Sequence, residues 1–150
     1  MPENKEKINV LFLCTGNSCR SQMAEGWARR LKSDVIEAFS AGIRPIGTNT
    51  RAIKVMAEAG VDISRQKSSH IEDFPAIDFD YVVTLCENAK QQCPIFPRNT
   101  KLIHKAFDDP YFATGTEEQI MAAFRNTRDE IRKFVEKMPG NLQESTRHNS

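Results

Sequence analysis

The sequence predicts a single-domain α/β protein with a four-stranded, mainly parallel sheet flanked by helices. Three observations lead to this prediction. The chain has 150 residues, which is the usual length of one domain. Short apolar runs alternate along it with longer segments in which apolar residues recur every three or four positions. Strands that alternate with helices are typical of a parallel sheet whose faces the helices cover.

The first expected elements form a strand, a loop and a helix. Residues 8–13, INVLFL, are apolar almost throughout, as in a strand that is buried on both faces. The polar segment 14–21, CTGNSCRS, follows this strand directly. Met23, Trp27 and Leu31 then repeat at every fourth position, which predicts a helix. A polar loop therefore lies between a buried strand and the beginning of a helix.

The middle of the chain contains three further strands and one helix. Residues 35–41, 81–85 and 102–107 are the expected strands, and residues 45–47 form a loop. We expect the intervening helix to end at Gly60, because glycine is common directly after a helix. The apolar residues Ile53, Met56 and Ala57 lie on one face of a helix at this spacing, which predicts the helix.

The last predicted helix has a recognisable beginning. Thr116 and Gln119 have the spacing of a capping box, in which each side chain binds a backbone N–H of the other residue. Six residues at steps of three and four continue this helix: Ile120, Phe124, Thr127, Ile131, Phe134 and Met138. The Pro-Gly pair that follows ends it. We expect residues 8–138 to form the domain, with flexible ends at 1–7 and 139–150.

Composition excludes several classes of protein. Twenty-one lysines and arginines against twenty acidic residues give a net charge of +1, without the basic excess of a nucleic-acid-binding protein. No apolar run approaches the roughly 20 residues of a membrane span, and the N-terminus lacks the apolar core of a signal peptide. Four cysteines are too few for a disulfide-rich secreted domain. We therefore expect a cytoplasmic monomer with reduced thiols, bound neither to nucleic acid nor to membrane.

The segment between the first strand and helix has the form of an anion-binding site. Backbone N–H groups at a helix N-terminus converge on an anion, and Gly16 can take the positive φ that brings them close. Arg20 offers a planar fork to two oxyanion oxygens. The same field favours the thiolate of Cys14, to which Ser21 can donate a hydrogen bond, while Asn17 braces the loop. We call the following residues the oxyanion loop: Thr15, Gly16, Asn17, Ser18, Cys19, Arg20 and Ser21.

A purely structural interpretation of this pattern is that Cys14 is a core cysteine at the end of a strand and that Arg20 is an unrelated surface residue. The strand before it, the glycine inside it and the helix after it favour a nucleophile instead. Chemistry at such a site needs an acid that protonates the leaving group. Asp109, within the segment 107–110, FDDP, follows the fourth strand and can reach the loop. It can equally be a turn residue, and Asp108 is the rival acid.

Two further cysteines, Cys86 and Cys93, are separated by seven positions. In a helix their Cα atoms would be about 10.5 Å apart, whereas a disulfide requires Cα atoms within about 7 Å. A Cys86–Cys93 disulfide would therefore require this segment to unwind, so we predict a weakly packed segment with a helical reduced form and a looped oxidised form. Two inert thiols and half of a zinc site are the alternatives. Cys19 is expected to be structural.

Three motifs together resemble a known family: CTGNSCRSQMAEGW at 14–27, VTLCENAKQQCP at 83–94 and FDDP at 107–110. They are similar to the thioredoxin-coupled arsenate reductases, over about residues 8–135. This resemblance implies the flavodoxin-like fold of the low-molecular-weight protein tyrosine phosphatases. It also implies that Cys14 attacks arsenate held by the loop and Arg20, while Asp109 protonates the departing oxygen.

The resemblance further implies a relay of three cysteines that reduces arsenate to arsenite in arsenic detoxification. Cys86 would attack the adduct on Cys14, and Cys93 would then attack Cys86. The resulting Cys86–Cys93 bond would be the redox-active disulfide. Thioredoxin is the implied external reductant, with glutaredoxin or mycothiol as alternatives, and no cofactor would be tightly bound.

The resemblance leaves a metal site open. Some members of the family bind potassium near the loop, and Asn17, Glu25 and Ser40 occupy the matching positions here. An acidic residue of the family is replaced by Ser69. We expect no other metal.

Two other functions compete with the reductase. A low-molecular-weight tyrosine phosphatase would use the same nucleophile, arginine and acid but would not need Cys86 or Cys93. The aromatic residues Tyr111 and Phe112 after the Asp-Pro pair favour this phosphatase interpretation. Ser18 and Gln22 stand where phosphatases tend to carry an apolar residue and a proline. Weak phosphatase activity is expected as a side reaction. A non-catalytic thiol sensor or metal-binding module would leave Arg20 unexplained.

Overall fold

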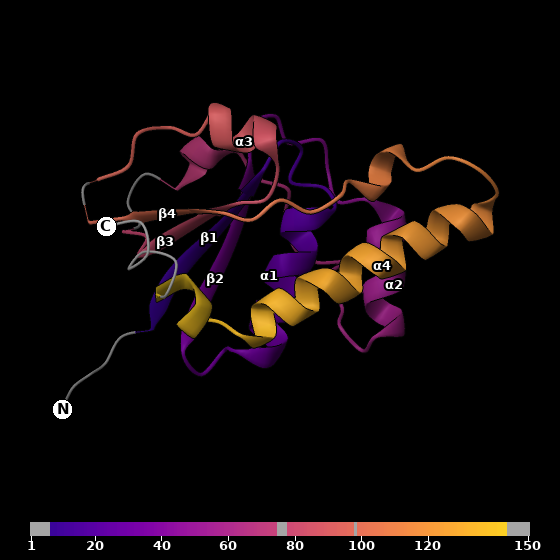
Figure 1. Ribbon diagram of the computed structural model, residues 1–150, viewed down its shortest axis with the longest axis horizontal. Coiled ribbons are helices and arrows are strands. Elements are labelled where there is room, and N and C mark those ends of the chain that lie inside the picture. The colour runs from indigo at the N-terminus through magenta and orange to yellow at the C-terminus, as the bar shows by residue number, and fades with distance from the viewer. Residues whose placement is uncertain (1–6, 75–77, 98, 144–150) are drawn as a thin grey trace.

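The computed structural model describes residues 7–74, 78–97 and 99–143, and within these ranges four strands form one sheet (Figure 1). Their order across the sheet is β2-β1-β3-β4, and all neighbouring strands are parallel. This arrangement confirms the predicted fold class. The strands are β1 (Ile8–Cys14), β2 (Ile36–Gly42), β3 (Tyr81–Thr84) and β4 (Lys101–His104).

Helices cover the sheet as predicted. In Figure 1 the longest helix, α4, runs alongside α1 and α2, while α3 begins where β3 ends. α1 packs against β1 and β2, and α4 packs against α1 and α2. The described helices are α1 (Arg20–Leu31), α2 (Thr50–Glu58), α3 (Glu87–Gln91) and α4 (Glu117–Glu136), with 3-10 turns at Ile71–Asp73 and Pro110–Phe112. None of these helices is long and apolar enough to cross a membrane.

The buried faces explain why these segments adopt these structures. The apolar run in β1 is inaccessible to solvent from Val10 to Leu13, as expected for a central strand with both faces covered. α4 begins with the predicted capping box of Thr116 and Gln119. Strand boundaries differ by up to three residues from the prediction, most of all at β4, which ends at His104 rather than at residue 107.

The face that α2 buries differs from the prediction. Ala52, Val55 and Met56 are buried, whereas Ile53 is half-buried and Ala57 is exposed. Apolar residues cover a wide arc of this short helix, so its sequence pattern is compatible with more than one buried face. Packing against α4 and α1 selects the face that is shifted by one residue.

The C-terminal boundary of the domain was also predicted wrongly. Residues 140–143 form a helical turn after α4, and the Leu142 side chain has no solvent exposure. The Asn141 side-chain amide donates to the carbonyl of Phe134 at 3.0 Å and holds this turn against α4. The domain therefore continues beyond residue 138, because one apolar residue in a polar segment reaches the core. The remaining parts of the expected flexible ends, 1–6 and 144–150, lie outside the described residues.

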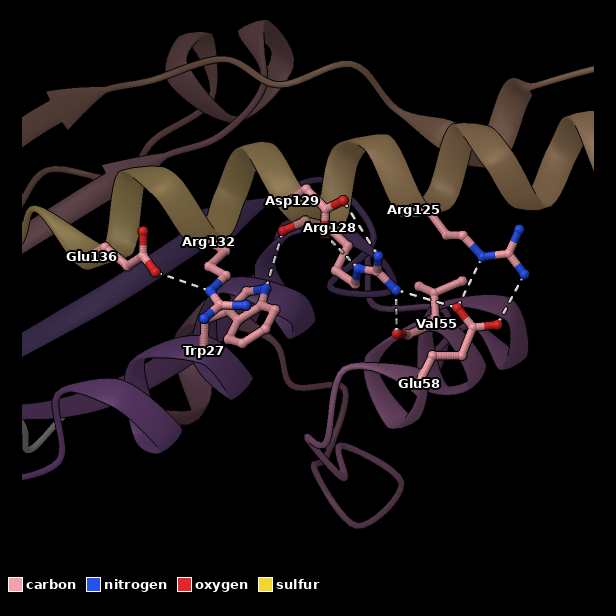
Figure 2. Close-up of polar contacts among 8 residues, drawn as sticks. All are labelled: Trp27, Val55, Glu58, Arg125, Arg128, Asp129, Arg132 and Glu136. Atoms are coloured by element: carbon pink, nitrogen blue, oxygen red, sulfur yellow. Dashed lines mark hydrogen bonds and ion pairs between the residues drawn. The ribbon is translucent and has the colours of Figure 1, made fainter.

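A polar network fastens α4 to the two helices beneath it (Figure 2). The Trp27 indole N–H donates to the carbonyl of Arg128 at 3.1 Å, and the Arg128 guanidinium donates to a backbone carbonyl of α2 at 2.9 Å. Arg125 makes two hydrogen bonds of 2.9 Å to the Glu58 carboxylate. The Arg132 guanidinium lies 5.0 Å from the centre of the Trp27 ring. α1, α2 and α4 thus form one connected layer, in which α1 packs against the sheet.

Candidate active site

The carboxyl ends of the strands bring the predicted site residues to one cavity of about 540 Å³. Cys14 is the last residue of β1, and Arg20 is the first of α1. Cys86 follows β3 after one residue, and Asp109 follows β4 after four. All four side chains line the cavity, which is the place where ligands bind in open α/β sheets.

The Cys14 sulfur lies at the base of this cavity, with 2% of the residue exposed. Its Sγ is 2.9 Å from the Ser21 hydroxyl oxygen. The Asn17 amide donates to the same oxygen at 2.8 Å. Because this amide supplies the hydrogen that the Ser21 oxygen accepts, the Ser21 hydroxyl hydrogen is free to point toward the sulfur. The contact between Ser21 and Cys14 that the sequence predicts is therefore formed, and it allows the hydroxyl group to donate to a thiolate.

Asn17, rather than Gly16, adopts the left-handed backbone conformation of the oxyanion loop. Its φ is +46°, and the residue is completely buried. Asparagine tolerates this conformation better than most residues. The prediction that Gly16 supplies the positive φ was wrong, because the Asn17 Oδ1 accepts the Ser69 backbone N–H at 2.6 Å and so holds the turn at residue 17.

Gly42 at the end of β2 is required by the oxyanion loop, and the sequence analysis did not identify it. A Cβ on Gly42 would lie 2.8 Å from the carbonyl oxygen of Thr15 and 2.9 Å from the nitrogen of Asn17. Neither backbone atom can move without deforming the loop. Its only sequence signal was a glycine at the end of a predicted strand, which is common at any turn.

A brace formed by residues 66–69 holds the loop from behind and was also missed. The Gln66 amide donates to the Gln22 side-chain oxygen at 2.8 Å, and the Gln22 amide donates to the carbonyls of Asn17 at 3.1 Å and Lys67 at 2.9 Å. The Ser68 hydroxyl donates to the Asn17 carbonyl at 3.0 Å. Residues 66–69 are more than 40 positions away in the chain from the Asn17 and Gln22 groups that they contact, so no local pattern reveals this brace.

Arg20 and Asp109 form an ion pair across the mouth of the site. The Arg20 Nη2 lies 3.0 Å from the Asp109 Oδ2, and its Nη1 donates to the carbonyl of Phe107 at 3.0 Å. The other Asp109 oxygen accepts the Tyr111 backbone N–H at 3.0 Å. Asp108, the rival acid, is exposed and does not occur among the described residues that line the cavity. The geometry therefore favours Asp109.

Cys86 lies beside the oxyanion loop and is 9% exposed. Its sulfur is 3.3 Å from the Thr15 hydroxyl oxygen and accepts the Ala89 backbone N–H at 3.4 Å, which makes Cys86 the N-cap of α3. The Asn88 amide donates to the Thr15 oxygen at 2.9 Å. The Thr15 hydroxyl hydrogen is therefore free for the Cys86 sulfur, in the direction that stabilises a second thiolate.

Cys93 and Cys19 occupy different surroundings. Cys93 is half-buried two residues beyond α3, and burial raises the pKa of its thiol. Within α3 only Ala89 is buried, which agrees with the expected weak packing of a helical reduced segment. Cys19 is buried at the start of α1, where burial and then the charge of Asp109 raise its pKa to about 12. All four cysteines are free thiols.

The residues of the suggested potassium site have other partners. The Ser40 hydroxyl donates to one Glu25 oxygen at 2.5 Å, and the Arg29 guanidinium lies 2.5 Å from the other. Burial raises the pKa of Glu25, and these two partners act against that shift. Asn17 directs its oxygen to Ser69 instead. Because a guanidinium already neutralises the buried carboxylate, this arrangement does not fit a potassium ion. Within the described ranges, no three His, Cys, Asp or Glu side chains cluster as a metal site either.

The outer wall of the active-site cavity is apolar. Tyr111 and Phe112 line it, are 52% and 74% exposed, and place their ring centres 5.1 Å apart. Ile46, whose backbone N–H donates to the Gly16 carbonyl at 3.0 Å, also lines the cavity, and Arg44 adds a cation. The cavity is thus much larger than a tetrahedral oxyanion needs.

Comparison with known proteins agrees with this geometry. The family described as Low molecular weight phosphotyrosine protein phosphatase matches residues 9–148. Arsenate reductase of Bacillus subtilis (strain 168) is 51% identical over 122 residues, covering 81% of this chain and 88% of the relative. Arsenate reductase of Halalkalibacterium halodurans is 49% identical over 126 residues, covering 84% and 91%.

Solved structures show the same relationship. An arsenate reductase in the phosphate binding state superposes with a TM-score of 0.69 at 34% identity, over 87% of this chain and 95% of that one. The low molecular weight protein tyrosine phosphatase from T. tengcongensis superposes with a TM-score of 0.71 at 26% identity, over 90% and 99%. The chain therefore belongs to the low molecular weight phosphotyrosine protein phosphatase family, with arsenate reductases among its relatives.

Proposed function

We propose that this protein reduces arsenate to arsenite through a relay of Cys14, Cys86 and Cys93, which thioredoxin regenerates. One observation carries the proposal: a second thiol, Cys86, lines the same cavity as the nucleophile and contacts the oxyanion loop through Thr15. A phosphatase mechanism has no use for this thiol. The names of the curated relatives support the substrate.

In the first step, arsenate lies on the backbone N–H groups of the loop and the guanidinium of Arg20. The Cys14 thiolate attacks arsenic, a sulfur–arsenic bond forms, and an oxygen leaves as water. Asp109 supplies the proton that this leaving oxygen needs. In the free protein Asp109 is ion-paired with Arg20, so arsenate takes its place on the guanidinium, and the released carboxyl group takes up a proton from solvent before it donates to the leaving oxygen.

In the second step, the Cys86 thiolate attacks the Cys14 sulfur. A disulfide forms between the two, and the electron pair of the sulfur–arsenic bond passes to arsenic. Arsenic(V) thereby becomes arsenic(III) and leaves as arsenite, while two thiols are oxidised to one disulfide. Thr15 supports this attack, because its hydroxyl stabilises the Cys86 thiolate beside the loop.

In the third step, Cys93 attacks the Cys86 sulfur and releases Cys14 as a thiolate. This step requires α3 to unwind, and a five-residue helix with one buried residue offers little resistance. The new Cys86–Cys93 disulfide lies toward the surface, next to Ile95, which is fully exposed. Thioredoxin then reduces this disulfide.

The same proposal places the protein in the cytoplasm as a monomer that takes part in arsenic detoxification. Four cysteines in 150 residues are too few for a disulfide-rich secreted domain, which supports a reducing compartment. One chain contributes all of the groups that the scheme uses, so a second copy is unnecessary.

A thiol count tests the relay. Reduced protein is exposed briefly to arsenate without oxygen and quenched in acid, with phosphate as control, and its thiols and disulfides are mapped. We expect arsenate to remove two thiols and phosphate none. Cys93→Ser should stop at a Cys14–Cys86 disulfide, while Cys19→Ser, the matched control, should behave as wild type. Intact thiols after arsenate would contradict the relay. Thioredoxin, glutaredoxin and mycothiol are then compared for reduction of the oxidised protein.

We also propose a weak phosphatase activity, which the aromatic wall supports. Tyr111 and Phe112 offer an apolar surface to the aryl group of an aryl phosphate, while the oxyanion loop binds its phosphate. Phe112→Ala should lower kcat/KM for p-nitrophenyl phosphate several-fold and leave arsenate reduction nearly unchanged. Cys86→Ser should abolish repeated arsenate reduction but retain phosphatase activity, and loss of both would contradict the assigned roles.

A further inference from the structure

Another cavity, of about 720 Å³, lies behind the oxyanion loop between α1, β2 and the segment 60–69. Its charge is unbalanced. Two of its described lining residues are acidic, Glu25 and Asp62. Four are cationic: Arg29, Arg30, Arg65 and Lys67.

The two acidic residues already have partners. Glu25 is neutralised by Arg29, and Asp62 accepts two hydrogen bonds from Ser64. Across the described ranges 7–74, 78–97 and 99–143, no carboxylate lies within ion-pair distance of the Arg30, Arg65 or Lys67 side chains. The charge of Arg65 helps to lower the pKa of Asp62, but Arg65 forms no ion pair with it, so Arg30, Arg65 and Lys67 remain available to a ligand that carries several negative charges.

One wall of this cavity is aromatic. Phe39 and Phe74 are half-buried, and their ring centres lie 5.8 Å apart. Because the cavity has the volume of a small-molecule site, it can hold an organic group as well as its anionic part. We propose that this cavity binds a nucleoside diphosphate or a related phosphate ester, with its phosphates on Arg30, Arg65 and Lys67 and its base against Phe39 and Phe74.

This cavity shares a structural segment with the active site. Lys67 and Ser69 line the cavity. From the same segment, the Lys67 carbonyl accepts the Gln22 amide, and the Ser69 N–H donates to Asn17 in the oxyanion loop. A ligand that orders residues 65–69 therefore also stabilises the loop, and by linkage an occupied loop strengthens binding in the cavity.

Calorimetric titration of the reduced protein with ADP and with pyrophosphate, in buffer free of phosphate, tests this site. We expect ADP to bind more tightly than pyrophosphate. Arg65→Ala with Lys67→Ala should weaken ADP binding about tenfold, because two charged contacts are lost. Lys54→Ala with Lys101→Ala is the matched control, since it removes the same charge from exposed positions outside the cavity, and should change binding less than twofold.

Three results would overturn the proposal. One is failure of ADP to bind at millimolar concentration, and another is equal binding of ADP to wild type and to the Arg65/Lys67 variant, which would show that these two side chains do not hold it. Equal affinities for ADP and pyrophosphate that Phe74→Leu leaves unchanged would exclude a site for the organic group. Because binding is measured without arsenate, failure here is distinct from failure of the reductase proposal.

Hydrogen exchange tests the link to the active site. Bound ADP should slow exchange of the Ser69 amide, which donates to Asn17, in wild type but not in the Arg65/Lys67 variant. Unchanged exchange with ADP bound would refute the coupling between the cavity and the loop.

Discussion

The Thr15 hydroxyl lies 3.3 Å from the Cys86 sulfur and joins the oxyanion loop to the beginning of α3. Asn88 of α3 donates its amide to the Thr15 oxygen at 2.9 Å, which leaves the hydroxyl hydrogen free to point toward the sulfur. Two segments 71 residues apart in the chain thus meet at one hydroxyl group. The second thiol of the proposed relay is held beside the anion site before any substrate binds.

The nucleophile is held in the same manner. The Asn17 amide donates to the Ser21 hydroxyl oxygen at 2.8 Å, and that oxygen lies 2.9 Å from the Cys14 sulfur. In both cases an asparagine amide orients a hydroxyl group, which in turn contacts a sulfur. The two arrangements can be tested separately, because they share no residue.

Ser21→Ala should slow alkylation of Cys14 by iodoacetamide at neutral pH about tenfold or more, since a hydrogen bond to a charged group is lost. Ser33→Ala is the control, because Ser33 is exposed and is not among the described residues that line the active-site cavity. Rates are measured by mass spectrometry of the Cys14 peptide. An unchanged rate for Ser21→Ala would show that the loop amides alone stabilise the thiolate.

Thr15→Val should slow the second step of the relay and spare the first. The substitution keeps the shape of the side chain but removes the hydroxyl that contacts Cys86. We expect arsenate turnover to fall about tenfold, with phosphatase activity nearly unchanged. Gln91→Ala, an exposed change in α3, should alter neither rate. A parallel loss of both activities would mean that Thr15 supports the loop as a whole.

Asp109→Asn should lower kcat for both reactions by about a hundredfold or more, because the general acid is lost. Asp108→Asn, one residue away and exposed, should remain within a few-fold of wild type. Steady-state rates with arsenate and with p-nitrophenyl phosphate measure the two variants. A larger loss of kcat in Asp108→Asn than in Asp109→Asn would assign the general acid to Asp108.

Glu58 should contribute to the loss of stability in acid. Hydrogen bonds from Arg125 hold the pKa of Glu58 below its ordinary value in the folded protein. A lowered folded-state pKa means that the contribution is complete above the unfolded pKa and is lost as the pH falls through the folded pKa. Urea unfolding of Glu58→Gln should therefore depend less on pH than wild type in the acid range below about pH 4.5, with Glu72→Gln, at an exposed position, as the control. Identical pH profiles for Glu58→Gln and wild type would show that the pair adds nothing.

Leu142→Ala should destabilise the protein by about 2–5 kcal/mol, because a fully buried side chain would leave a cavity. Ile95→Ala, at a fully exposed position, should change stability by less than about 0.5 kcal/mol. Urea denaturation measures both. A negligible effect of Leu142→Ala would restore the flexible tail predicted from residue 139.

Local patterns were sufficient for much of this protein. The apolar run of β1, the four-residue spacing in α1 and the capping box of α4 identified those elements, because backbone geometry imposes a short period on the side chains that face the core. The meeting of Cys14, Cys86 and Asp109 also followed from the sequence, since the carboxyl ends of parallel strands share one edge of a sheet.

Tertiary structure alone decided the features that depend on distant partners. Which face α2 buries, which loop residue adopts a positive φ, and whether Leu142 reaches the core all depend on the neighbour against which each segment packs. The brace of residues 66–69 and the Thr15–Cys86 contact join positions more than 40 residues apart. A periodic pattern records only that a residue is apolar or polar, whereas packing and hydrogen-bond geometry determine which partner it meets.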